Sequence, residues 1–216
     1  RDINDLLNLS SMGFRGEALA AICAIAHVEL RTRQEDANIG TRVVLEGSSF
    51  VSQDSVSCAK GSSFEIKNLF FNTPARRNFL KSDAIEYKHI VSEFERVALA
   101  FPNISFYLYN NDQEIYALER TTNAKQRIAN YFDNTYNHKL VGINESTQLF
   151  RISGYLSKPE FCRKTKKEQF IFVNNRFIKS QYINNAIVNA YSQYITTDYF
   201  PSYFLYIDID PSKIDI

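Results

Sequence analysis

The chain has 216 residues, of which 44% are hydrophobic and 23% are charged, and its formal net charge is +1. This composition is that of an ordinary globular protein, and the near-neutral charge means that any nucleic-acid surface must come from local clustering. No apolar run is long enough to span a membrane, and the three scattered cysteines argue against a disulfide framework or a zinc site. We therefore expect a cytoplasmic protein without a membrane partner and without metal-binding residues.

Helical and strand patterns alternate through the first 120 residues. Leu19, Ile22 and Ile25 stand at helical spacing, and β-branched runs that follow are typical of strands. Thr73 before Pro74 predicts the start of a second helix. The expected elements are a helix over 15–26, strands over 28–33, 41–46 and 64–66, a helix start at 73–74, a long amphipathic helix over 83–101 and a hairpin of strands over 105–109 and 114–118.

A polar stretch at 120–122 precedes a new helix and marks the expected domain boundary. The elements expected beyond it are a helix over 123–132, strands over 140–143, 150–156 and 169–173, a helix over 181–194 and a strand over 203–209. A strand, a helix and a strand joined by short links imply a right-handed crossover. The pattern predicts an α/β (α+β) protein with two packed units, residues 1–120 and 121–216.

Two glycines flank a cation directly before the first predicted helix. The candidate phosphate-binding residues are Gly13, Phe14, Arg15, Gly16, Glu17, Ala18 and Leu19. Glycine lets a ligand come close to the backbone, and the free N–H groups of a helix N-terminus suit phosphate. A loop of this kind is most often only a turn, and Arg15 on its own could be a solvated residue at the helix start.

Three segments in order resemble signatures of the MutL family, the DNA mismatch repair ATPases of the gyrase, chaperone, histidine-kinase and MutL superfamily. Gly-Phe-Arg-Gly-Glu-Ala-Leu at 13–19 resembles the ATP-lid motif of the family. Asn-Leu-Phe-Phe-Asn-Thr-Pro-Ala-Arg-Arg-Asn-Phe-Leu at 68–80 resembles its LFxNTPARRKFL signature, and Phe-Val-Asn-Asn-Arg at 172–176 resembles VNGR. The resemblance implies the later half of a Bergerat-type ATP-binding α/β sandwich over 1–120. A transducer domain with a ribosomal-protein-like βαβ fold, truncated at its C-terminus, would follow over 121–216.

The resemblance also implies a longer parent protein that uses ATP and Mg²⁺. That parent would hydrolyse ATP, form a homodimer on binding ATP and bind DNA nonspecifically. It would also relay a signal from a mismatch-recognition protein to downstream nicking or excision factors. The catalytic Glu and the magnesium-binding Asn of the family lie upstream of the lid motif, and its γ-phosphate Lys follows the last expected strand. We therefore expect a piece of the parent without a catalytic residue and without ATPase activity of its own.

The resemblance assigns roles to residues of the first half. It implies that backbone N–H groups of 13–19 contact the nucleotide and that Arg15 helps to order the lid. Glu17 could be a general base by its chemistry, but the upstream position of the family's Glu argues against that role. Ser62 and Ser63 align with a Gly-Thr element of the nucleotide pocket, although a plain strand entry explains them nearly as well. The NTPARR segment is interpreted as mainly architectural.

The strongest local charge bias lies between Lys158 and Lys179, where cations alternate with phenylalanines around a predicted turn at 174–175. Such a surface binds the DNA backbone without reading sequence, although a basic run is usually only a solvated face. The candidate DNA-binding residues are Lys164, Lys166, Lys167, Arg176 and Lys179. Arg176 matches the arginine of VNGR, which is associated with DNA binding in the family. Asn175 replaces the family's Gly, and Asn tolerates the left-handed conformation such a turn needs.

Two other readings of the function stay open at this point. The chain could be a nucleic-acid-binding module without nucleotide chemistry. It could also belong to another ATPase of the superfamily, such as a type II topoisomerase subunit. The NTPARR and VNNR segments count against the topoisomerase reading.

Overall fold

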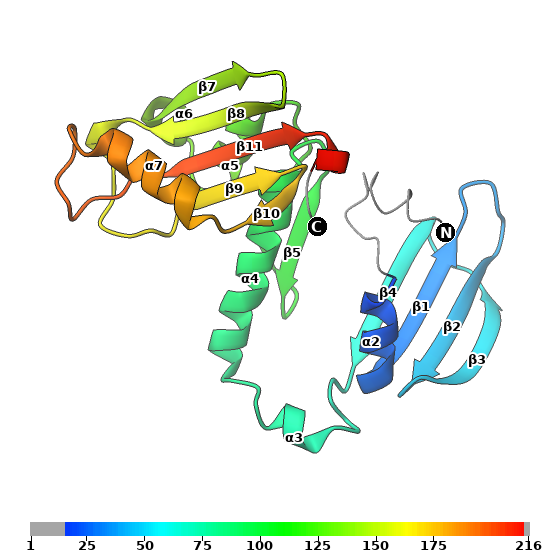
Figure 1. The fold of residues 1–216 in the computed structure, drawn as a ribbon. Coiled ribbons are helices and arrows are strands. Elements are labelled where there is room, and N and C mark those ends of the chain that lie inside the picture. The colour runs from blue at the N-terminus through cyan, green and yellow to red at the C-terminus, as the bar shows by residue number, and fades with distance from the viewer. Residues whose placement is uncertain (1–15, 214–216) are drawn as a thin grey trace. The chain divides into compact units, whose positions relative to one another are not determined.

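The computed structural model describes residues 16–213, and Figure 1 shows their helices and strands. The chain divides into two compact units, which within this range comprise residues 16–86 and 87–213. It passes from one unit to the other between Glu86 and Tyr87, inside helix α4 (Asp83–Ala100). In the described range, no helix is both long and apolar enough to cross a membrane.

The first unit is an antiparallel sheet with a short helix against it. Its elements are α2 (Ala18–Ile25), β1 (His27–Arg33), β2 (Gly40–Glu46), β3 (Ser49–Val56), β4 (Gly61–Lys67) and α3 (Pro74–Arg77). The strand order is β3-β2-β1-β4, and α2 contacts β1 and β2 (Figure 1). The three strands expected from the sequence are confirmed. Strand β3 was not expected, because most of its residues are polar and exposed and give little apolar signal.

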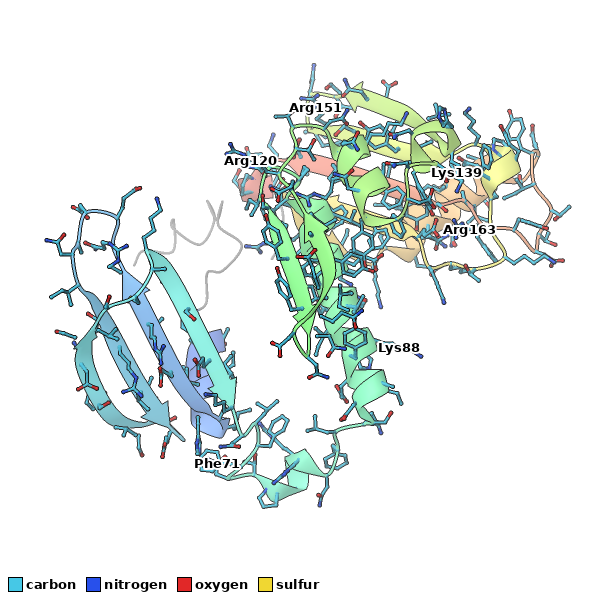
Figure 2. All side chains as sticks on the ribbon, turned by 180° about the vertical axis from the view of Figure 1, so that it is seen from behind. Phe71, Lys88, Arg120, Lys139, Arg151 and Arg163 are labelled. Carbon is cyan, nitrogen blue, oxygen red and sulfur yellow. The ribbon has the colours of Figure 1, made fainter. Side chains whose placement is uncertain are left out.

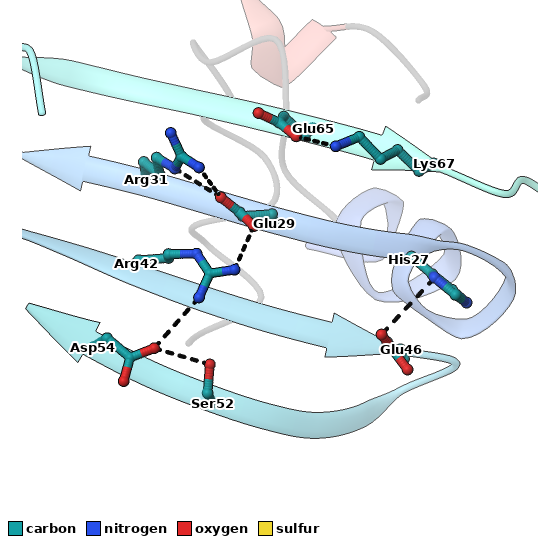
Figure 3. A network of polar contacts seen from close by, with 9 residues as sticks. All are labelled: His27, Glu29, Arg31, Arg42, Glu46, Ser52, Asp54, Glu65 and Lys67. Carbon is teal, nitrogen blue, oxygen red and sulfur yellow. Dashed lines mark hydrogen bonds and ion pairs between the residues drawn. The ribbon is translucent and has the colours of Figure 1, made fainter. Parts of the chain in front are cut away.

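One face of this sheet carries a network of charged side chains (Figure 3). The Glu29 carboxylate accepts hydrogen bonds from Arg42 Nη2 and from Arg31 Nε, each at 2.7 Å, and Arg42 also pairs with Asp54 at 3.4 Å. The hydrogen bond from Arg42 is the main reason why the pKa of Glu29 falls to about 2. Since side chains alternate along a strand, Val28 lies on the opposite face, where it is buried.

The second unit is built around a five-stranded mixed sheet. Its elements are α4, β5 (Phe106–Asn110), β6 (Gln113–Leu118), α5 (Ala124–Tyr131), α6 (Tyr136–Lys139), β7 (Leu140–Ser146), β8 (Phe150–Ser157), β9 (Gln169–Val173), β10 (Arg176–Ile178), α7 (Gln181–Tyr191) and β11 (Tyr203–Ile209), with 3₁₀ turns at Pro159–Phe161 and Pro211–Lys213. The order is β10-β9-β11-β8-β7, with β9 and β11 parallel and the other pairs antiparallel. The expected strand–helix–strand connection is therefore present between β9 and β11, through β10 and α7.

Hydrophobic side chains fill both faces of this sheet. On one face Phe170, Phe172 and Phe204 pack against α4 and α5. On the other face Ile171, Tyr203 and Leu205 pack against Ile183 and Ile187 of α7. Successive residues of β9 thus belong to different cores, as strand alternation requires. The sheet has helices on both sides, as Figure 1 shows.

Packing does not follow the division expected near residue 120. Leu99, Leu118 and Ile128 share one buried cluster although they lie on both sides of that point. The buried Arg127 guanidinium donates to the carbonyls of Leu118 and Pro102, at 3.1 and 2.9 Å. The physical reason is that the β5–β6 hairpin is only two strands, too few to be stable alone, and packs with the helices around it. The assignment of two family domains to 1–120 and 121–216 stays a prediction, whereas the packing units divide inside α4.

Candidate functional site

The candidate phosphate-binding segment leads into helix α2. Gly13, Phe14 and Arg15 lie outside the described residues. Gly16 has φ +68°, a left-handed conformation that favours glycine, and a Cβ there would have no atom within 4 Å. The helix begins at Ala18 rather than at residue 15, since Glu17 only precedes it, and residues 16–19 are all exposed. The backbone at the start of α2 is therefore accessible to a ligand.

Residues 68–72 hold the opposite end of α2. The Phe70 N–H donates to the Ile25 carbonyl at 2.7 Å, and Asn72 Nδ2 donates to the Ala24 carbonyl at 2.9 Å. The last carbonyls of a helix lack partners within it, so these bonds terminate α2 from outside. The segment that resembles the NTPARR signature therefore makes structural contacts, in agreement with its architectural interpretation.

Thr73 stands at the N-cap position of α3, as the sequence predicted, but it does not cap the helix. Its side chain makes no capping hydrogen bond, and Thr73 Oγ1 is buried without a partner. Helix α3 has only four residues. Pro74, whose ring fixes φ near the helical value, gives the local reason why a helical turn begins here.

Ser62 and Ser63 lie near the start of β4. Ser62 is paired with Thr32 of β1, and their hydroxyl oxygens are 2.8 Å apart. Ser63 is paired with Arg31, on the charged face of the sheet. Because alternate residues of a strand point to opposite faces, the two serines cannot both contact one ligand on one face. Ser62 lies on the face opposite the charge network, and its hydroxyl bonds to that of Thr32.

The turn between β9 and β10 has the backbone that the sequence predicted. Asn174 and Asn175 have φ +47° and +63°, so the expected left-handed conformation at Asn175 is confirmed. Asn174 also joins the turn to β11: its Nδ2 donates to the Ile209 carbonyl at 2.8 Å, and its Oδ1 accepts from the Ile209 N–H at 3.0 Å. The sequence placed Asn174 in this turn but did not predict its bonds to β11, although the ability of Asn to bond nearby backbone was a usable signal.

Arg163, one cation of the basic segment, is engaged inside the fold. Its guanidinium lies 2.8 Å from the Glu168 carboxylate and donates to the Tyr136 hydroxyl at 2.8 Å. Glu168 is buried and also accepts from Ser202 Oγ at 2.7 Å. Lys139 lies over the same Tyr136 ring, so Arg163 and Lys139 are neighbours in Figure 2. Part of the charge bias read from the sequence is thus structural.

The predicted DNA-binding residues occupy two kinds of position. Lys164, Lys166, Lys167 and Lys179 are exposed, whereas Arg176, the first residue of β10, is half-buried. Lys164 lies over the Tyr199 ring at 5.7 Å, and Lys166 over the Phe200 ring at 4.5 Å. Lys166 and Lys179 line one pocket of about 240 Å³, and the other three residues are not among its lining residues. The structure therefore brings these two lysines together.

Glu95 of the second unit has a raised pKa. Burial, and to a lesser extent the negative charge of Glu168, raises the pKa of Glu95 to about 7, while Arg96 acts in the opposite direction. In the range 16–213 no group of three or more His, Cys, Asp or Glu side chains could hold a metal ion.

Known proteins resemble the chain in sequence. Residues 128–216 match the family model described as DNA mismatch repair protein, C-terminal domain. The DNA mismatch repair protein MutL of Flavobacterium psychrophilum is 54% identical over the whole chain, which covers 35% of that relative. MutL of Bacteroides fragilis is 46% identical over the whole chain, which covers 34% of it. The chain thus spans about a third of the length of these curated relatives.

Solved structures share the fold. The N-terminal domain of a DNA repair protein superposes with a TM-score of 0.83 at 22% identity, over all of this chain and 73% of that one. The MutL ATPase domain of Aquifex aeolicus, complexed with ADP, superposes with a TM-score of 0.74 at 21% identity, over 98% of this chain and 76% of that one. These structures show the fold alone, which is that of MutL ATPase domains. The sequence matches over the whole chain show that it belongs to the MutL family of DNA mismatch repair proteins.

Proposed function

We propose that the protein to which this chain corresponds is an ATP-dependent DNA mismatch repair protein. It binds and hydrolyses ATP with Mg²⁺, forms a homodimer in the ATP state and couples mismatch recognition to nicking or excision factors in the cytoplasm. The observation that carries the proposal is the 45–54% identity to MutL proteins over the whole or nearly the whole chain. Such extended identity favours MutL over a topoisomerase subunit, since the gyrase B-subunit of Myxococcus xanthus shares 9% identity and the fold alone.

For nucleotide binding, the chain would supply phosphate contacts rather than catalysis. Gly16 has a left-handed backbone conformation that favours glycine, and the exposed start of α2 has N–H groups that suit an anion. Ser62 can exchange its hydrogen bond with Thr32 for one to a ligand. An ATPase domain that holds ADP in a protein of the same fold supports this assignment over a module without nucleotide chemistry. No described residue is assigned to Mg²⁺.

For DNA binding, the second unit would supply phosphate contacts that are independent of sequence. Lys164, Lys166 and Lys167 precede β9, Lys179 follows β10, and all four are exposed. Lysine binds phosphate as a point charge and does not read bases. Contacts of this kind suit a protein that must act at any position in a genome.

The DNA-binding part is tested with the 216-residue chain in a filter-binding salt titration on duplex DNA. Affinity should fall with salt at a log–log slope of roughly −0.9 per phosphate contact. Arg176→Glu should weaken binding to all sequences alike, and more than Lys88→Glu, a matched charge reversal at an exposed site on α4. Melting curves run beside the titration detect loss of fold. Unchanged affinity of a folded Arg176→Glu protein would contradict the proposal.

A further inference from the structure

The pocket that contains Lys166 and Lys179 lies on the α7 side of the five-stranded sheet. It is bounded by the starts of the parallel strands β9 and β11, at Gln169 and Tyr203, and by Ile178 at the end of β10. The first turns of α7 complete the wall with Gln181 and Asn184. Its volume of about 240 Å³ leaves room for several water molecules or for a small ligand group.

The floor of the pocket is formed by side chains of the hydrophobic core. Ile171 and Tyr203 are 2% and 3% exposed and belong, with Ile178, to the core beneath α7. The Tyr203 hydroxyl donates to Asn184 Oδ1 at 3.1 Å, which fixes the amide of Asn184 at the pocket wall. That bond uses the amide oxygen, so Asn184 Nδ2 is the group that can donate to a ligand.

The rim of the pocket is cationic. Among residues 16–213, neither Lys166 nor Lys179 pairs with an acidic side chain, whereas nearby Arg163 is neutralised by Glu168. The Phe200 ring, 4.5 Å from Lys166 Nζ, restrains one of the two ammonium groups. Two like charges at one cavity repel each other until an anion lies between them, and the partial positive charge of the start of α7 adds to this preference.

A cationic rim over an apolar floor suits a ligand that has an anionic part and an apolar part. We propose that this pocket binds one nucleotide unit of a DNA strand, with its phosphate at Lys166 and Lys179 and its sugar or base on Ile171, Ile178 and Tyr203. The inference rests on the proposed DNA binding and extends it to a formed site. Strand alternation places Arg176 on the same face of β10 as Ile178, about 7 Å along the strand, so a DNA strand at Arg176 also reaches the pocket.

The first test asks whether the two pocket lysines contribute more to DNA binding than other exposed lysines of the same charge. Lys166→Gln/Lys179→Gln removes both pocket lysines, and Lys164→Gln/Lys167→Gln removes two exposed lysines of the same segment that do not line the pocket. Fluorescence anisotropy measures binding of each 216-residue variant to labelled oligothymidylate. We expect the pocket variant to lose about tenfold in affinity and the control variant about threefold or less. Melting curves should match the unmodified chain, since all four lysines are exposed.

The second test uses single small ligands, observed by chemical-shift changes in NMR spectra. Thymidine 5′-monophosphate should shift the signals of Ile171, Ile178 and Asn184 in the unmodified chain and not in the pocket variant. Inorganic phosphate alone should bind more weakly, because it cannot use the apolar floor. Equal binding of the two ligands would assign the pocket to free phosphate and overturn the proposed nucleotide site.

The outcomes distinguish this inference from the proposed function. Equal losses in the two double variants would overturn the pocket and leave DNA binding in place. Oligothymidylate that fails to bind, with monophosphate still bound through Lys166 and Lys179, would overturn the DNA function and leave a nucleotide site. Tighter binding of an acidic peptide than of oligothymidylate would overturn the nucleotide assignment.

Discussion

The two units of this chain differ in how much apolar surface they bury. In residues 16–86 the fully buried apolar side chains of the described range are Ala26 and Val28, while Phe50 of the sheet is 62% exposed. In residues 87–213 two hydrophobic clusters fill both faces of a sheet. Since burial of apolar surface is the main stabilising contribution, the second unit contains its own core and the first depends far more on its hydrogen-bonded strands.

Charge is also used differently in the two units. In the first, Glu29 lies between Arg31 and Arg42, and the pKa of its carboxyl is lowered to about 2. In the second, burial beside Glu168 raises the pKa of Glu95 to about 7. The ionised form of Glu29 is therefore stabilised on the open sheet and that of Glu95 is destabilised by burial, which gives these two carboxyl groups opposite effects on stability as the pH changes.

The largest expected effect compares one phenylalanine in each unit. Phe172 is fully buried and stacks on Phe170 and Tyr206, so Phe172→Ala should lower the free energy of unfolding by about 3–5 kcal/mol. Phe64 of β4 is 45% exposed, and Phe64→Ala should cost about 1 kcal/mol or less. Urea denaturation followed by circular dichroism measures both. Similar losses in the two variants would show that the described exposure of the first sheet does not hold in solution.

A smaller effect is expected from Glu95, and its size depends on pH. The folded state holds a proton on Glu95 up to about pH 7, whereas the unfolded chain releases it near 4.5, so stability should fall as pH rises between these values. Glu95→Gln should remove this loss and stabilise the protein at pH 8 by about 1–2 kcal/mol, a figure reduced for partial exposure to water. At pH 4.5 the difference should vanish.

Melting temperatures of both proteins, measured between pH 4.5 and pH 8, test whether Glu95→Gln stabilises the protein as expected. The matched control is Glu145→Gln, at an exposed position of β7 in the same unit, in which the loss of stability assigned to Glu95 should remain. A Glu95→Gln protein that is less stable than the unmodified chain at pH 8 would contradict the role assigned to burial.

The sequence predicted most of the elements but not the way they pack. Strands such as Gln169–Val173 and Tyr203–Ile209 were expected at their observed bounds, because β-branched and aromatic residues mark them clearly. Strand β3 was missed because its exposed polar residues give no such signal. The packing boundary was expected near residue 120, and no local pattern shows that Arg127 bonds backward to the carbonyls of Pro102 and Leu118.

For the candidate sites, too, the sequence predicted residues but not how the fold brings them together. Spacing in the sequence singled out Lys164, Lys166, Lys167 and Lys179 as equals. Only the fold separates them, because the pairing of β9 with β11 and the start of α7 enclose a pocket beside Lys166 and Lys179. Likewise Arg163 looked like another surface cation, and its pairing with the buried Glu168 depends on contacts that the sequence does not show.

The smallest expected effect concerns the end of α2, in the unit with little core. Asn72→Ala removes the hydrogen bond from Asn72 Nδ2 to the Ala24 carbonyl, worth about 0.5–1.5 kcal/mol. The backbone bond from Phe70 to Ile25 remains, so α2 should open more often at its last turn without melting as a whole. Faster hydrogen exchange at the amides of the last turn of α2, measured by NMR, is the expected result. Asn78→Ala, at an exposed position just after α3, is the control and should leave exchange in α2 unchanged. Equal exchange in the two variants would mean that the 68–72 segment does not hold the helix, and its architectural role would then be wrong.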